Sequence, residues 1–211
     1  VGESLAVERR LARGARRNRD RRLKRKRQLM DRLITLDLMP KDEQKRKEVI
    51  NIDPYLLRAK AVTEKLTANE LGRVLFHLSQ RRGFLSNRKS DGDEESGKIK
   101  PKITELRKAL GNKTLGQWLF EQAEKGKSIR FYGSEGDFYP DRAMYLDEFD
   151  KIREKQNKNH NLSSDDWDVL RNGNKDQKFD GLFYQRPLKP VEKGGCEFFI
   201  EEFLAHKDLP I

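Results

Sequence analysis

Arginine is the residue type in this sequence best suited to binding chemistry, and it is concentrated near the N-terminus. Within residues 9–32 arginine outnumbers lysine by eleven to two, and the acidic residues in that range are Asp20 and Asp31. A guanidinium group presents a planar set of donors that matches two phosphate oxygens at once, which an ammonium group cannot do. The composition therefore favours a site for phosphate groups over charge spread for solubility.

Eight arginines form the candidate site, and on a helix they would point in many directions rather than along one stripe. They are Arg9, Arg10, Arg13, Arg16, Arg17, Arg21, Arg22 and Arg25. Residues 1–36 carry a net charge of +9 and the remaining 175 residues only +2, so nearly the whole net charge of +11 lies in one segment. A nucleic acid is the expected partner. The alternatives are a solvated basic tail, a localisation signal, or binding to an acidic protein or a membrane surface.

The segment that carries these arginines is predicted to form one long helix over residues 5–36. It has no proline, a single glycine at Gly14, and many residues with high helix propensity. Residues 16–22 (RRNRDRR) include no apolar side chain, so the helix cannot bury a continuous face against a protein core. We expect it to pack at its two ends and to stay bare between them. Gly14 is either a weak point of the helix or a place where another backbone approaches closely.

The rest of the chain is predicted to be mostly helical. Helices are expected over residues 51–66, over 67–82 with a capping box from Thr67 to Glu70, over 103–126 with a break at Gly111, over 143–156, and from Ser163 or Ser164 onward. Residues 86–102 are expected to form a polar loop. The predicted fold class is therefore mainly α, with a long arginine-rich helix, a helical lobe with irregular loops, and a small hairpin near the C-terminus.

Other candidate chemistry is weak. The three histidines and one cysteine lack metal-ligand spacing, so zinc is not expected, and His77 is interpreted as a structural residue beside an apolar face. The acidic residues of 91–95 are interpreted as a solvated loop rather than a cation site. No glycine loop for phosphate and no nucleophile elbow is present. Tyr132, Phe138 and Tyr139 could stack on bases, although core packing is the commoner role for aromatic residues.

Several features limit the cellular setting. A single cysteine excludes an internal disulfide and fits a reducing compartment. No apolar run approaches the roughly 20 residues that span a bilayer. The chain begins with Val1 rather than methionine, which would suit a piece of a longer protein.

Residues 5–34 (LAVERRLARGARRNRDRRLKRKRQLMDRLI) resemble the arginine-rich bridge helix of the CRISPR type II RNA-guided DNA endonucleases. Further blocks resemble that family's recognition lobe in the same order: DPYLLRAKAVTEKLTANELGRVLFHLSQRRGFLSNRK, TLGQWL, YPDRAMYLDEFDKIREKQ, and LFYQRPLK followed by GCEFF. The short recognition region is similar to the compact, type II-C-like members. The resemblance implies a bridge helix over residues 1–36 and a helical recognition (REC) lobe over residues 37–211.

The resemblance also implies roles for individual residues. The bridge helix of that family grips the guide RNA backbone, which implies this role for Arg10, Arg13, Arg16, Arg17, Arg21, Arg22 and Arg25. Contacts with the repeat–anti-repeat duplex and the heteroduplex are implied for Arg81, Arg82, Arg88, Arg186 and Lys189. Within this family base pairing reads the sequence, while the protein holds the duplex by its backbone and its A-form shape.

The implied partners are a guide RNA (crRNA:tracrRNA) and a target-DNA heteroduplex, in antiviral defence in the bacterial cytoplasm. None of the family's nuclease segments is matched, so the chain is expected to bind without cutting, with no catalytic residue, metal or cofactor of its own. Mg²⁺ is expected for the parent nuclease. One alternative is a protein-interaction module whose arginine helix is bound by an acidic partner such as a phage anti-CRISPR inhibitor. Another is a stand-alone enzyme with an unfamiliar site.

Overall fold

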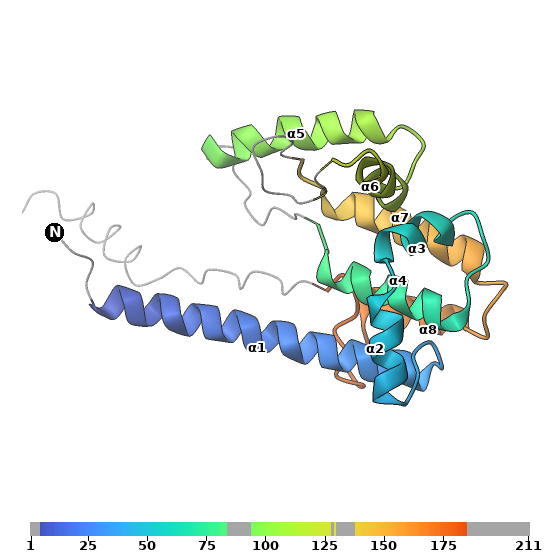
Figure 1. Cartoon of the computed structure of the whole chain (residues 1–211). Coiled ribbons are helices and arrows are strands. Elements are labelled where there is room, and N and C mark those ends of the chain that lie inside the picture. The colour runs from blue at the N-terminus through green and yellow to red at the C-terminus, as the bar shows by residue number, and fades with distance from the viewer. Residues whose placement is uncertain (1–4, 84–93, 128, 130–137, 185–211) are drawn as a thin grey trace, which may run out of the picture.

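The computed structural model describes residues 5–83, 94–127, 129 and 138–184, and Figure 1 shows how they are arranged. Within these residues the chain forms eight α-helices and no β-strand, which confirms the mainly-α prediction. Helix α1 (Leu5–Thr35) extends away from a group of seven shorter helices. These are α2 (Glu43–Asn51), α3 (Pro54–Ala61), α4 (Ala68–Gln80), α5 (Glu94–Leu110), α6 (Leu115–Glu124), α7 (Arg142–Gln156) and α8 (Ser164–Asn172). We call the described part of residues 38–184 the helical lobe.

The C-terminal end of α1 is closed by a Schellman motif that directs the chain into the lobe. Asp37 adopts a left-handed conformation with φ +54°. The Leu38 amide then donates to the Leu33 carbonyl at 2.9 Å, and the Asp37 amide donates to the Ile34 carbonyl at 3.1 Å. These bonds satisfy carbonyls that the last helical turn leaves free. Leu33 and Leu38 are both buried, so the turn fixes the point at which α1 joins the core.

Helix α4 lies at the centre of the lobe. The predicted capping box is present, since the Thr67 hydroxyl accepts from the Glu70 amide and the Glu70 carboxylate accepts from the Thr67 amide. Every residue from 71 to 78 is buried, because the lobe and the C-terminal part of α1 together cover this helix. A Cβ atom at Gly72 would collide with the carbonyl oxygen of Leu38. The backbone of α4 therefore packs directly against the turn that follows α1.

A buried ion pair joins α3, α6 and α7. Arg58 donates from Nε and Nη2 to the two carboxylate oxygens of Glu148, each at 2.7 Å, and both side chains are fully buried. One of these oxygens also accepts from the Gly116 amide at 2.8 Å. Burial lowers the pKa of Arg58, but the adjacent Glu148 carboxylate outweighs burial and the net pKa is raised. The guanidinium therefore stays charged and holds three helices together.

Aromatic residues pack α7 against α8 and the chain that follows α8. The Phe149 ring meets Trp167 and Phe183 edge-on, with ring centroids 5.7 Å apart in both pairs. Gly173 and Gly181 both have positive φ, and a Cβ atom on either would strike the facing backbone. This close approach positions residues 173–183 beside the end of α1, where the Gln28 amide donates to the Lys178 carbonyl.

Several predicted elements agree with the structure and others do not. The break at Gly111 and the helix capped by Ser163 are confirmed. The polar loop expected over residues 86–102 is wrong in part, because α5 begins at Glu94 and includes Pro101. The expectation that the arginine helix packs at both ends is also wrong, because only its C-terminal end packs within the described chain. The hairpin near the C-terminus falls largely on residues 185–211, outside the described residues, and the described chain holds only an isolated bridge between Asn174 and Phe179.

Candidate nucleic-acid interface

The arginine-rich part of α1 is exposed to solvent. From Glu8 to Lys24 every residue except Gly14 is exposed, and Figure 1 shows the first turns of α1 extending beyond every other labelled helix. Among the described residues, the ion pair found on this stretch joins Arg19 to its neighbour Asp20 at 3.3 Å, with side chains 70% and 65% exposed. An exposed pair of this kind contributes little to stability. The remaining guanidinium groups of the stretch are not matched by carboxylates of the described chain.

The leucines of this stretch are exposed to solvent as well. Leu11 is 64% exposed and Leu23 is 53% exposed. No atom outside the helix backbone and its immediate neighbours lies within 4 Å of a Cβ placed on Gly14, so nothing in the described chain requires glycine there. From Glu8 to Lys24 the helix is therefore exposed to solvent around its whole circumference.

The base of α1 is firmly attached to the lobe. Leu29 and Leu33 are buried in the core. Arg32 Nη2 donates to Asp166 Oδ1 at 2.9 Å, and the other oxygen of this carboxylate accepts from the Ser163 amide at the start of α8. The Lys26 ammonium lies 5.4 Å from the centroid of the Phe76 ring. These contacts fix the direction in which the exposed part of α1 leaves the lobe.

A cavity of about 900 Å³ opens where α1 meets the lobe. Six cationic side chains line it, four from α1 and two from the residues that directly follow α4: Arg19, Arg22, Arg25, Lys26, Arg81 and Arg82. The rest of the wall includes Tyr139, Tyr145, Leu29 and Leu182. The concentration of positive charge in a concave site strengthens its attraction for anions.

Arg82 is tied into the lobe as well as facing this cavity. Its Nη1 donates to the Tyr184 carbonyl, and Arg142 Nη1 donates to the neighbouring Phe183 carbonyl at 2.8 Å. Burial, with Arg25 and Arg142 close by, lowers the pKa of Arg82 to about 10. The group still carries its charge at neutral pH, so Arg82 combines a structural hydrogen bond with a position on the cavity wall.

His77 is structural, as its place beside the apolar face suggested. It is buried, and its ring meets Tyr55 edge-on with centroids 5.0 Å apart. Burial and the nearby charges of Arg58, Arg73 and Arg81 lower its pKa to about 3. The imidazole is therefore neutral at physiological pH.

The structure brings together only some of the residues that the sequence nominated. Arg22, Arg25, Arg81 and Arg82 meet at the cavity. The other nominated arginines of α1 lie along its exposed part: Arg9, Arg10, Arg13, Arg16, Arg17 and Arg21. Arg88, Arg186 and Lys189 lie outside the described residues. The roles assigned to all of these residues stay predictions.

Arg19, Lys26, Leu29 and Tyr145 are among the cavity residues that the sequence did not nominate, although one signal was available for those on α1. Arg22, Lys26, Leu29 and Leu33 recur at helical spacing, and the last two belong to the core. That spacing places Arg22 and Lys26 on the face directed at the lobe. Of the aromatic candidates, Phe138 meets Trp118 edge-on beside the core, with ring centroids 5.2 Å apart. Tyr139 lines the cavity, and Tyr132 lies outside the described residues.

Known proteins share this arrangement of a long helix and a helical lobe. No protein-family model matches the chain. The CRISPR-associated endonuclease Cas9 of Campylobacter jejuni is 30% identical over 230 aligned residues, which cover 100% of this chain and 23% of that protein. Cas9 endonucleases are homologues of this chain. The chain spans less than a quarter of the length of that relative.

Solved Cas9 structures share the fold described above. The crystal structure of Campylobacter jejuni Cas9 in complex with sgRNA and target DNA superposes with a TM-score of 0.68 and 25% identity, covering 88% of this chain and 26% of that one. A cryo-EM assembly of St1Cas9 with sgRNA, target DNA and AcrIIA6 gives a TM-score of 0.57 and 25% identity, covering 75% of this chain and 19% of that one. The long helix and the lobe thus occur together in Cas9.

Two further observations concern the described residues alone. They contain no group of three or more His, Cys, Asp or Glu side chains placed to hold a metal ion. Nor is any of their helices both long and apolar enough to cross a membrane.

Proposed function

We propose that this chain is the guide-RNA-binding portion of an RNA-guided DNA endonuclease of antiviral defence. In this proposal α1 and the adjacent cavity hold the crRNA:tracrRNA guide and the RNA–DNA heteroduplex. The observation that carries it is the run of exposed arginines on α1, among which the described chain supplies a carboxylate partner to Arg19 alone. Support also comes from the homologous Cas9 endonucleases and from the Campylobacter jejuni complex that contains sgRNA and target DNA.

The physical basis of the proposal is neutralisation of phosphate charge. A helix of 31 residues is about 46 Å long, so its side chains can follow a nucleic-acid backbone over several nucleotides. Guanidinium groups pair with phosphates in a bidentate manner, and each pair releases counterions from the nucleic acid. Because the arginines surround the helix, phosphates from different strands can bind at once. Such contacts hold the backbone and leave sequence recognition to base pairing.

The cavity gives this helix a second function, which is to orient the bound strand. Arg81 and Arg82 face Arg22, Arg25 and Lys26 across it. A strand that follows α1 would therefore meet cations from the lobe at the base of the helix. The Arg32–Asp166 ion pair and the buried side chains of Leu29 and Leu33 attach α1 to the lobe that carries Arg81 and Arg82.

We further propose that DNA cleavage, and the Mg²⁺ that it would require, belong to parts of the whole protein other than this chain. This proposal predicts that the purified chain binds RNA but does not cut DNA in a magnesium-dependent assay. Cleavage that is lost on substitution of one Asp or Glu of this chain would contradict it.

A protein partner is the second candidate, and the same exposed cations favour it. A protein with a strongly acidic surface could occupy α1 by imitating phosphate groups, and one St1Cas9 assembly contains AcrIIA6. Reversing the charges of Arg16 and Arg17 should then abolish co-elution with such a protein. The two functions would compete for one surface.

A titration with guide RNA tests the main proposal. Fluorescence anisotropy at low salt should give submicromolar binding for the 211-residue chain. A variant in which Arg13, Arg16, Arg17 and Arg21 are replaced by glutamine keeps helix propensity and loses charge, so it should bind far more weakly. Absence of binding by the natural chain near micromolar concentration would contradict the proposal.

A further inference from the structure

The cavity between α1 and the lobe has features that are not needed for binding phosphate groups alone. Beside its cations, the wall carries the Tyr139 ring together with Leu29 and Leu182. The Lys102 ammonium lies 5.5 Å from the centroid of the Tyr139 ring. An aromatic surface next to cations is the combination on which single bases stack while their phosphates are neutralised.

Tyr145 adds a polar group with no partner. Its side chain is fully buried and lines the same cavity, and its hydroxyl makes no hydrogen bond within the described chain. Burial raises its pKa, so the phenol keeps its proton and can donate. A buried hydroxyl without a partner is destabilising and calls for an explanation. A ligand atom that enters the cavity and accepts this proton would supply one.

The neighbourhood of Tyr145 contains a second unmatched donor. The guanidinium carbon of Arg58 lies 5.5 Å from the centroid of the Tyr145 ring, and Arg58 Nη1 is buried without a partner. The ion pair with Glu148 uses Arg58 Nε and Nη2 only. The Tyr145 hydroxyl and Arg58 Nη1 are thus two buried donors without an acceptor, and a carbonyl oxygen of a base would provide an acceptor for the hydroxyl.

The size of the cavity sets a further limit on its occupant. A volume of about 900 Å³ falls within the range of roughly 300–1,000 Å³ that small-ligand sites occupy. This space holds a single nucleotide but not a base-paired helix. Turning a nucleotide out of a helix is easiest where it is already unpaired.

We propose that this cavity receives one unpaired nucleotide of the bound RNA, turned out of its helix, with its base against Tyr139 and a base oxygen at the Tyr145 hydroxyl. The phosphate of that nucleotide lies at the cationic rim formed by Arg22, Arg25 and Arg82. This inference rests on the proposed function and names the element of the RNA that the site selects.

Three RNA hairpins of equal length test the inference with the full 211-residue chain. The first is fully paired, the second has one unpaired uridine in its stem, and the third has an abasic nucleotide at that position. The second and third carry the same number of phosphates, so their comparison isolates the base. We expect the hairpin with the unpaired uridine to bind about tenfold more tightly than either of the others.

Two variants locate the effect. Tyr145→Phe removes only the unmatched hydroxyl, so its melting temperature should be unchanged or higher, while affinity for the uridine hairpin should fall about threefold to tenfold. Tyr139→Ala should abolish the preference for the uridine hairpin. Tyr55→Phe, which alters a tyrosine beside Arg58 but outside the cavity wall, is the matched control and should leave the preference intact. Affinity for the fully paired hairpin should not change in any of them.

The outcomes separate this inference from the proposed function. If no hairpin binds, the proposed function fails and this inference fails with it. If all three bind with equal affinity, phosphate contacts suffice and this inference alone is overturned. It is overturned also if the uridine hairpin is preferred but Tyr145→Phe and Tyr139→Ala retain the full preference.

Discussion

Replacing Glu148 with alanine should destabilise the helical lobe strongly. The substitution removes the acceptor of three buried hydrogen bonds, two from Arg58 and one from the Gly116 amide. It leaves a fully buried guanidinium without a carboxylate. Breaking a buried ion pair by removing one partner costs about 3–5 kcal/mol of unfolding free energy. Since a domain is typically stable by about 5–15 kcal/mol, the variant should be only marginally folded.

Urea unfolding followed by tryptophan fluorescence measures this loss. Of the two tryptophans, Trp167 is fully buried and packs on Phe149 of α7, and Trp118 lies on α6, so their emission reports on the packing of these helices. The matched control is Glu121→Ala, which removes an ion pair to Lys113 whose side chains are 33% and 51% exposed. An exposed pair contributes about 0–1 kcal/mol.

Glu148→Gln gives a second test, because it keeps an acceptor oxygen for Arg58 and loses the charge. Its loss of stability should lie between those of Glu148→Ala and Glu121→Ala. If Glu148→Ala and Glu121→Ala lose the same free energy, the reasoning that the buried pair holds α3, α6 and α7 together is refuted.

Three further predictions concern packing, pH and order. Gly72→Ala should lower the melting temperature because its Cβ would strike Leu38. Gly14→Ala, whose Cβ meets nothing within 4 Å, should raise helicity measured by circular dichroism without lowering the melting temperature. An equal fall in melting temperature for both variants would contradict this. Because the pKa of His77 is lowered to about 3, the unfolded chain takes up a proton below about pH 6.5 while the folded chain does not until about pH 3. The unfolding free energy should therefore fall as the pH is lowered from about 6.5 to about 3. Urea titrations at several pH values should show this fall, and His77→Gln should reduce it. Amide hydrogen exchange over residues 9–24 should be fast in the free protein and slow with RNA bound, because the described chain leaves the side chains of these turns exposed to solvent; equal protection in both would count against the account.

Local signals in the sequence predicted much of the fold. The capping box at Thr67, the break at Gly111 and the start of α8 at Ser163 depend on residues close together in the chain, and each occurs where expected. The start of α5 was missed because glycine, serine and Pro101 outweigh helix propensity in residues 86–102. Glu94, the first residue of α5, has the acidic side chain that stabilises a helix N-terminus, but this signal is weaker than the helix-breaking residues around it.

The site could be predicted only in part. The exposure of α1 followed from its charge, because residues 16–22 have no apolar side chain to bury. The cavity could not be foreseen, because it depends on how Tyr139 and Tyr145 pack against the base of α1. The pairing of Arg58 with Glu148 spans 90 residues of sequence, and no local pattern indicates which carboxylate a buried arginine will meet.

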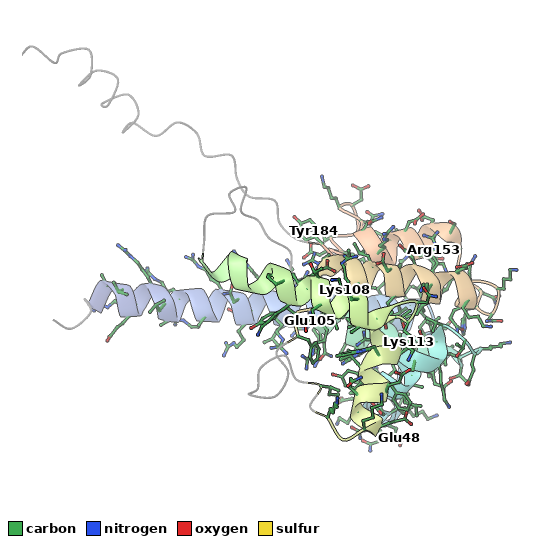
Figure 2. All side chains as sticks on the ribbon, turned by 90° about the horizontal axis from the view of Figure 1, so that it is seen from above. Glu48, Glu105, Lys108, Lys113, Arg153 and Tyr184 are labelled. Carbon is green, nitrogen blue, oxygen red and sulfur yellow. The ribbon has the colours of Figure 1, made fainter. Side chains whose placement is uncertain are left out.

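The most direct test of the account is the salt dependence of guide-RNA affinity. If seven arginines of α1 each neutralise a phosphate, the logarithm of the binding constant should fall with the logarithm of salt concentration with a slope of about −6. Affinity should then drop about 10³-fold to 10⁴-fold between 50 and 200 mM salt. Arg16→Gln and Arg17→Gln should each make the slope shallower by about one, while Lys113→Ala, on the part of the lobe away from the free end of α1 (Figure 2), should not. A slope near zero, or one that these arginine variants leave unchanged, would contradict the claim that α1 binds phosphate.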